Sequence, residues 1–170
     1  MATALLVVDV QRDLVDALAP ERRAAFLQTV SGTIAGARER GIPVVYVRHA
    51  DEELQPGTPG WEIAGEIAPR DGEAVVEKRF RDAFRETNLA ETLARVGADH
   101  VVVCGMQTEF CIDATVREAE RRGYRVTLVG DGHATFPIDG ATEEQIRAHV
   151  NRVARGIAQI ASADDVWALR

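Results

Sequence analysis

Short, continuous runs of apolar residues alternate along this chain with segments of helical periodicity, and this alternation is the strongest constraint on its fold. The runs lie at residues 4–9, 42–47, 74–76, 101–104 and 124–129. Runs without polar interruption are typical of parallel strands that are covered on both faces. Between them, apolar residues recur every three or four positions, as in amphipathic helices. The pattern predicts an α/β fold with a mostly parallel central sheet flanked by helices.

Four helices are expected beside these strands. One begins at Pro20 and ends before Gly41, because proline suits a first helical turn and glycine suits a C-terminal cap. A second is capped by Thr87 or Asn88 and ends at Gly97. The third ends at Gly123 and carries Thr115, Val116 and Ala119, and the last carries one apolar face of Ile146, Val150, Val153, Ile157 and Ile160.

Length and composition narrow the class of protein. The 170 residues suit a single domain over 1–170, and no apolar stretch is long enough to span a membrane. A net charge of −7 argues against binding to nucleic acid, and the start of the chain does not resemble a signal peptide. Only two cysteines are present, so a reducing, cytoplasmic location is expected, with no disulfide framework. No zinc motif or cofactor motif is found, and the expected partner is a small-molecule substrate.

Reactive side chains follow three of the predicted strands. Asp9 ends the first run, Lys78 follows two residues after the third, and Cys111 lies shortly after the fourth, where a helix begins. In open α/β sheets, ligands bind at the carboxyl ends of the strands. The sequence therefore predicts that a carboxylate, an ammonium and a thiol meet at one edge of the sheet.

Such a group of side chains suits nucleophilic catalysis. A free thiol has a pKa of about 8.5, and a helix N-terminus and a nearby ammonium can lower it to roughly 3.5–7.5. We therefore expect Lys78 to favour the thiolate of Cys111, and Asp9 to carry the proton. Backbone N–H groups in the turn at residues 106–111 are candidates for an oxyanion hole. Taken singly, an aspartate here is more often a cap or turn residue, a lysine a solvated charge and a cysteine core packing. The joint arrangement makes an active site about as favoured as these readings, and spacing alone does not decide between them.

Three segments and one loop resemble the isochorismatase-like cysteine hydrolases. Residues 5–13 (LLVVDVQRD) are similar to the family's opening strand, and residues 76–80 (VEKRF) are similar to its lysine segment. Residues 103–115 (VCGMQTEFCIDAT) resemble its nucleophile segment, which is the most specific of the three. Residues 57–63 (GTPGWEI) resemble a loop of many members. The resemblance extends along nearly the whole chain.

The resemblance implies a three-layer Rossmann-like fold and a catalytic triad of Asp9, Lys78 and Cys111. It also implies a cis peptide bond between Met106 and Gln107, with the backbone N–H groups of Gln107 and Cys111 forming the oxyanion hole. A homo-oligomer, commonly a dimer or tetramer, is expected on the same ground.

Two departures from the family pattern bear on function. Metal-binding nicotinamidases of this superfamily carry an Asp-x-His pair and a further histidine, whereas here Glu52 and Glu53 follow Asp51. We therefore expect no metal ion. Leu14 stands where many relatives have an aromatic residue, so the wall of the pocket is expected to differ.

The pattern predicts hydrolysis of a small amide or related C–N bond through a thioester on Cys111. The alternatives are isochorismatase-type cleavage of a vinyl ether, a non-catalytic binding protein on the same fold, and a flavodoxin-like receiver domain. The receiver reading lacks an acidic pair beside the first strand and leaves residues 105–115 unexplained.

The substrate pocket is expected beside the long Pro- and Gly-rich segment at residues 49–72. Gln11 is expected to support the triad, and His133 is expected to be a solvated loop residue with a possible polar contact to substrate. Cys104 is expected to be structural. The candidate pocket walls are Trp61, Phe84, Phe110 and Phe136, with core packing as the alternative reading for the three phenylalanines.

Overall fold

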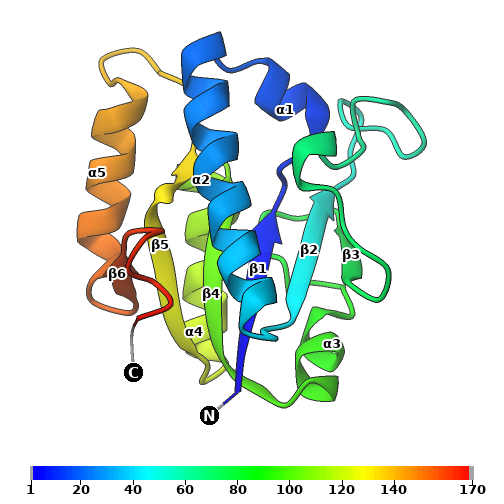
Figure 1. The fold of residues 1–170 in the computed structure, drawn as a ribbon. Coiled ribbons are helices and arrows are strands. Elements are labelled where there is room, and N and C mark those ends of the chain that lie inside the picture. The colour runs from blue at the N-terminus through cyan, green and yellow to red at the C-terminus, as the bar shows by residue number, and fades with distance from the viewer. Residues whose placement is uncertain (1, 169–170) are drawn as a thin grey trace.

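A six-stranded sheet in which all neighbouring strands are parallel forms the centre of the computed structural model, which describes residues 2–168 (Figure 1). The strand order is β3-β2-β1-β4-β5-β6. This confirms the predicted α/β class with a parallel sheet. The strands are β1 (Ala2–Val8), β2 (Val44–His49), β3 (Ala74–Lys78), β4 (Ala98–Met106), β5 (Arg125–Ala134) and β6 (Gln159–Ala161).

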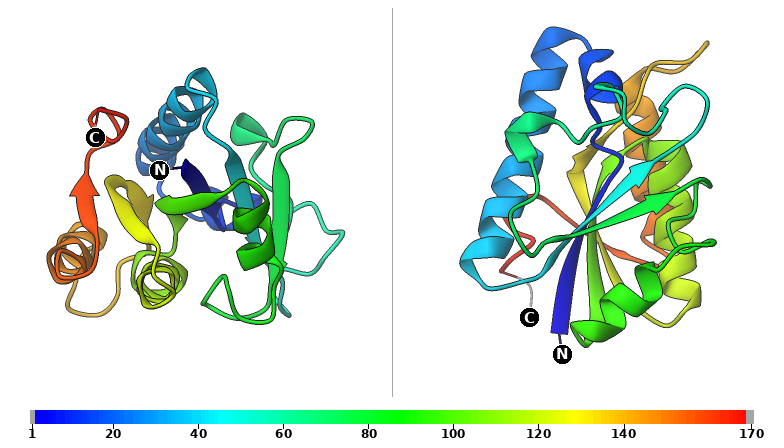
Figure 2. Two further views of the ribbon diagram at one scale, coloured as in Figure 1. Left: turned by 90° about the horizontal axis from the view of Figure 1, so that it is seen from below. Right: turned by 90° about the vertical axis from the view of Figure 1, so that its right-hand side faces the viewer.

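Helices cover both faces of the sheet, which gives three layers. Figure 2 shows α2 and the C-terminal segment on one face, and α3, α4 and α5 on the other. No helix among residues 2–168 is long and apolar enough to cross a lipid bilayer. The helices are α1 (Arg12–Asp16), α2 (Pro20–Glu39), α3 (Leu89–Arg95), α4 (Asp113–Arg121) and α5 (Glu143–Ala154).

The apolar run of β1 is continuous because both of its faces are buried. Leu5 and Val7 belong to the core cluster under α2, whereas Leu6 and Val8 belong to the cluster under α3 and α4. Successive side chains of a strand point to opposite faces, so a strand between two helical layers needs apolar residues at every position.

The strand order reverses at β1, which has β2 on one side and β4 on the other. At this switch point the carboxyl ends of the strands diverge and leave room for a ligand.

β1 and β4 pack closely against each other next to this edge of the sheet. Gly105 of β4 has φ 132°, and a Cβ at this position would overlap with the carbonyl of Val8. Only glycine therefore allows β1 and β4 to approach so closely here.

The last helix ends earlier than the apolar pattern predicts. α5 stops at Ala154, and Ile157 and Ile160 lie beyond it; Ile160 belongs to β6, which pairs with β5. Both isoleucines pack against the same core cluster as Ala154. Because helix and strand face one core, their apolar residues imitate a continued helical period. Val153, placed on the buried face by the pattern, is 43% exposed.

Candidate active site

The three side chains predicted to meet at the strand ends lie together, with Lys78 between the other two. Its Nζ lies 2.7 Å from Oδ2 of Asp9 and 3.2 Å from Sγ of Cys111. Asp9 follows β1, Lys78 ends β3, and Cys111 lies in the turn after β4. The Asp9 and Lys78 residues are each 1% exposed, so this ion pair is withdrawn from water. Its charges are therefore weakly screened and strongly felt by the thiol.

Asp9 occupies an uncommon backbone conformation that aims it into the site. Its φ is 52°, which is the left-handed region that aspartate tolerates better than most residues. Its N–H donates to the carbonyl of Val47 at 2.8 Å, which ties the turn to β2. Oδ2 accepts from Lys78, while Oδ1 is buried and has no hydrogen-bond partner among residues 2–168. Oδ1 therefore leaves Asp9 one oxygen that is not engaged by Lys78.

Cys111 lies in a π-helical turn, Thr108–Ile112, that leads into α4. The Met106–Gln107 peptide bond before this turn is cis. The carbonyl of Gln107 accepts the N–H groups of Phe110 at 3.1 Å and Ile112 at 3.2 Å. These bonds hold the turn in place on either side of the cysteine.

His133 of β5 is fully buried rather than solvated, and no part of it lines the pocket that contains the thiol. Its Nδ1 lies 2.9 Å from Oγ1 of Thr108, and its Nε2 lies 3.0 Å from Oδ1 of Asn151. The Asn151 amide donates to the carbonyl of Gly130, so Oδ1 is the acceptor and His133 carries its proton on Nε2. His133 therefore accepts the hydroxyl hydrogen of Thr108 and links the turn at Thr108–Ile112 to α5.

The thiol of Cys111 is not activated in the way that we predict from the sequence. Burial and the charge of Asp9 raise its pKa to about 12, and the opposing effect of Lys78 is smaller. Burial disfavours the charged form of an acid, and a neighbouring carboxylate does so too. The resting thiol of Cys111 is therefore neutral. Cys104 is also buried, and burial alone raises its pKa to about 12.

His49, at the end of β2, is a member of this site that we do not predict from the sequence. Its Nδ1 lies 2.9 Å from Nζ of Lys78, and its Nε2 lies 3.1 Å from Oδ2 of Asp51. His49 and Lys78 are register partners in β2 and β3, so their side chains point to the same face. The strand-end rule that selects Asp9 also selects His49 when it is applied to β2.

Three potential metal ligands, from Asp9, His49 and Cys111, lie within 4.8 Å of one another. The ammonium of Lys78 stands 2.7, 2.9 and 3.2 Å from their respective acceptor atoms. A metal ion bound by all three would lie against this positive charge. The group therefore fits an ammonium and does not fit a metal ion.

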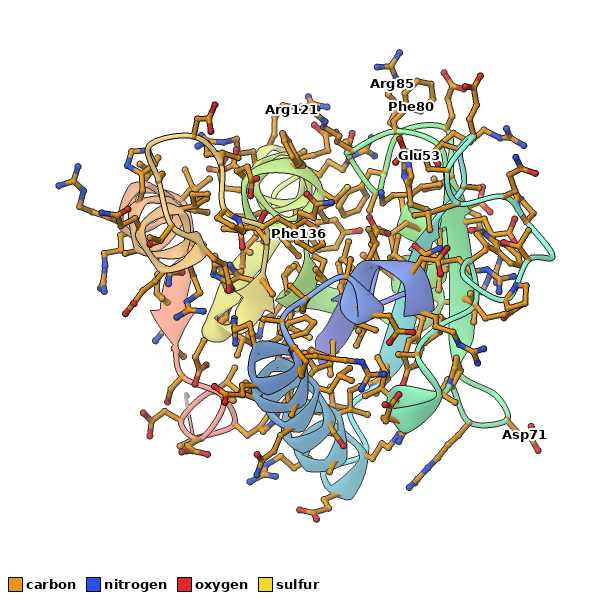
Figure 3. All side chains as sticks on the ribbon, turned by 90° about the horizontal axis from the view of Figure 1, so that it is seen from above. Glu53, Asp71, Phe80, Arg85, Arg121 and Phe136 are labelled. Carbon is orange, nitrogen blue, oxygen red and sulfur yellow. The ribbon has the colours of Figure 1, made fainter. Side chains whose placement is uncertain are left out.

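A pocket of about 560 Å³ opens above these side chains. Figure 3 looks onto this edge of the molecule and labels Glu53 and Phe136, which belong to the loops after β2 and β5. Phe110 and Phe136, two of the candidate pocket walls, line this pocket. The other lining residues are Asp9, Asp13, Leu14, Ala17, His49, Asp51, Glu53, Leu54, Arg81, Gln107 and Cys111.

The other three candidate pocket residues lie elsewhere. Phe84 is 4% exposed and stacks on Tyr124 in the core, with ring centroids 5.7 Å apart. The guanidinium of Arg48 lies over the Trp61 ring, 3.4 Å from its centroid, and Trp61 is not among the residues that line the pocket. Gln11 is fully buried, and its amide bonds to the backbone of His49 and Trp61. Their apolar or amide surface thus supports the fold around the pocket instead of lining it.

Comparisons of the sequence and of the fold with known proteins identify the family of this chain. The sequence model of the isochorismatase domain matches residues 3–165. The chain belongs to the isochorismatase family. The crystal structure of an isochorismatase-type protein from Oleispira antarctica superposes with a TM-score of 0.90 at 31% identity, covering 99% of this chain and 97% of that one. The three-layer fold is therefore that of the family.

Curated relatives of this family member are named for different substrates. Streptothricin hydrolase of Streptomyces noursei is 40% identical over 147 residues, which cover 82% of this chain and 52% of that protein. The chain thus spans about half the length of that relative. Nicotinamidase 3 of Arabidopsis thaliana is 31% identical over 178 residues, covering 95% of this chain and 85% of the relative.

Proposed function

We propose that this chain hydrolyses a small-molecule amide or a related C–N bond through a thioester on Cys111. The observation that carries the proposal is the arrangement around Lys78. One ammonium contacts both Oδ2 of Asp9 and Sγ of Cys111, while Oδ1 of Asp9 has no hydrogen-bond partner in the part of the chain that the structure describes. The names of the two relatives, a streptothricin hydrolase and a nicotinamidase, support the reaction class.

In the proposed first half-reaction, Asp9 accepts the thiol proton as Sγ of Cys111 attacks the substrate carbonyl. Since the pKa of the resting thiol is raised to about 12, proton removal accompanies the attack and does not precede it. The backbone N–H groups of Gln107 and Cys111 hold the oxyanion. The C–N bond then breaks, and the amine leaves with the proton from Asp9.

In the second half-reaction, Asp9 accepts a proton from water as the water oxygen attacks the thioester. The C–S bond breaks, the sulfur takes back the proton, and the acid is released. Lys78 stabilises the negative charge as it moves between the carboxylate and the sulfur, and its hydrogen bonds hold both groups in place. Atoms and charge balance over the two steps.

The proposal is tested by a screen of primary amides and carbamoyl and ureido compounds, with ammonia or amine release as the readout. On a confirmed substrate we expect Cys111→Ala to lower kcat by roughly 10³-fold or more, since it removes the nucleophile. Cys104→Ala is the matched control, because it removes a thiol from β4 outside the pocket. Retained turnover of the amide by Cys111→Ala would contradict the proposal. So would a preference for isochorismate over every amide in both the unmodified protein and Cys111→Ala.

A further inference from the structure

The ammonium of Lys78 has a third partner, beyond the two that the proposed mechanism uses. It lies 2.7 Å from Oδ2 of Asp9, 3.2 Å from Sγ of Cys111 and 2.9 Å from Nδ1 of His49. An ammonium has three N–H donors and no acceptor. These three contacts therefore use its full hydrogen-bonding capacity, and Nδ1 of His49 must accept.

This requirement fixes the state of His49. An imidazole that accepts at Nδ1 is neutral and carries its proton on Nε2. That proton points toward Oδ2 of Asp51, 3.1 Å away. The other oxygen of Asp51 accepts the backbone N–H groups of Glu53 at 2.9 Å and Leu54 at 2.8 Å. The hydrogen bonds thus run in one direction, from Lys78 to His49 to Asp51, and end on a carboxylate anchored in the loop.

The backbone of His49 is held as firmly as its ring. Oε1 of Gln11 accepts the N–H of His49 at 2.8 Å, and Nε2 of Gln11 donates to the carbonyl of the same residue at 2.9 Å. Nε2 also donates to the carbonyl of Trp61 at 2.9 Å. Gln11 is fully buried, so water does not compete for these hydrogen bonds, which join β2 to the segment after β1. His49 is therefore oriented from both sides.

We propose that His49, oriented by Asp51 and Gln11, is a positioning residue that holds the Lys78 ammonium between Asp9 and Cys111. This inference rests on the proposed function of those two groups. Without the acceptor at Nδ1, one N–H of Lys78 would be left buried and unpaired, which disfavours the charged ammonium at this place. His49 thus acts on the thiol through Lys78.

The charges around His49 agree with a neutral ring. Burial lowers the pKa of His49, and the charge of Lys78 on β3 lowers it further, whereas Asp9 after β1 and Asp51 in the loop oppose them. Burial would raise the pKa of Asp51, but the N–H groups of Leu54 and Glu53 and the neighbouring His49 outweigh it, so the carboxyl stays ionised. Glu53, Arg81 and the thiol of Cys111 also line the pocket beside His49.

The test compares His49→Asn with His49→Leu. The two replacements have nearly the same shape, so they leave similar access to the thiol, but only asparagine can offer Lys78 an oxygen acceptor where Nδ1 stands. The readout is the second-order rate of iodoacetamide labelling at Cys111, measured by mass spectrometry at one alkaline pH. This rate requires no knowledge of the substrate. The exposed His149→Asn is the control.

We expect His49→Leu to slow labelling of Cys111 by about tenfold or more, since a hydrogen bond to a charged group is lost. We expect His49→Asn to stay within about threefold of the unmodified protein, and kcat on a confirmed amide to follow the same order. Equal labelling rates for the leucine variant and the unmodified protein would overturn the inference.

A second measurement remains informative if the leucine variant does not fold. ¹⁵N NMR of the histidine-labelled protein should show His49 as a neutral ring with its proton on Nε2, and Asp51→Ala should weaken this preference. A proton on Nδ1 would overturn the inference. A correct tautomer and the expected labelling order without any amide turnover would remove the proposed function and leave the role of His49 intact.

Discussion

The thiol and the carboxylate of this site influence each other in a way that defines the chemistry at the scale of single residues. The buried charge of Asp9 raises the pKa of Cys111, although Lys78 contacts both groups. The site therefore does not resemble a preformed ion pair between a thiolate and an ammonium. In the proposed mechanism the carboxylate of Asp9 lies beside a neutral thiol, and its Oδ1 is available to accept the thiol proton.

Asp9→Asn separates these two possibilities. Removing the carboxylate charge removes one of the causes that raise the pKa of Cys111, so the thiolate fraction at a fixed pH increases. We expect iodoacetamide labelling of Cys111 at pH 8 to become about tenfold faster, while amide turnover falls by roughly 10²–10⁴ because the proton acceptor is lost. Slower labelling together with lower turnover would contradict the role of Asp9 as a general base. Asp13→Asn, which changes an exposed carboxylate at the pocket, is the control for labelling.

Strand ends were the most informative elements in the sequence. Asp9, Lys78 and Cys111 could be selected because each follows an apolar run, and parallel strands bring their carboxyl ends to one edge. The burial of His133 was not predicted, because the apolar run ends at residue 129 whereas β5 continues to Ala134. For Phe84 the sequence left pocket wall and core packing open. β6 escaped prediction because it has only three residues. For both side chains, the sequence does not show which neighbouring segment covers them.

The buried His133 makes the contact between β5, α5 and the nucleophile turn sensitive to acid. Burial lowers the pKa of His133 to about 4, whereas an unfolded histidine has a pKa of about 6.5. Between these values the unfolded chain binds a proton that the folded chain does not, so the free energy of unfolding falls as the pH falls. This group contributes a loss of about 3 kcal/mol across that range.

Urea unfolding at pH 7 and pH 4.5 tests this expectation. His133→Gln should be less stable than the unmodified protein at pH 7, because it disturbs the bonds to Thr108 and Asn151. Between the two pH values, however, it should lose about 2 kcal/mol less, since glutamine does not titrate. His149→Gln, at an exposed position of α5, serves as the control. An equal loss in the unmodified protein and His133→Gln would show that another group causes the acid sensitivity.

At the scale of the whole molecule, the fold and the family were within reach of the sequence, but the shape of the pocket was not. The alternation of runs and helices predicts the layers, and residues 103–115 identify the family. The pocket is built from loops after β1, β2, β3, β4 and β5, and its walls depend on how these loops fold over one another. Trp61 shows the difficulty, because its ring stacks on Arg48 and not on a ligand site.

The charges around the pocket are expected to favour cationic over anionic small molecules, and this can be measured without a substrate. Asp13, Asp51 and Glu53 line the pocket together with one arginine, Arg81, whose guanidinium lies over the Phe110 ring, while Asp9 and Lys78 neutralise each other. The protein as a whole carries a net charge of −7. Both features attract cations toward the pocket at low ionic strength.

We therefore expect a cationic aminoethyl methanethiosulfonate to modify Cys111 faster than the anionic sulfonatoethyl reagent, relative to their rates with a small free thiol. The ratio should decrease when salt is raised from 0.01 M to 0.1 M, since the screening length shortens from about 30 Å to about 10 Å. Glu53→Gln should reduce it as well. A ratio that favours the anionic reagent would contradict the expected field.

The most direct test of the central claim is the mass of the protein, acid-quenched during turnover of an amide identified in the screen. We predict an added mass equal to the acyl group of the substrate, confined to the peptide that contains Cys111, and lost on treatment with hydroxylamine as a thioester requires. The adduct should be absent from Cys111→Ala and present in Cys104→Ala. An acyl group on another residue, or steady turnover by Cys111→Ala, would contradict a thioester mechanism at this site.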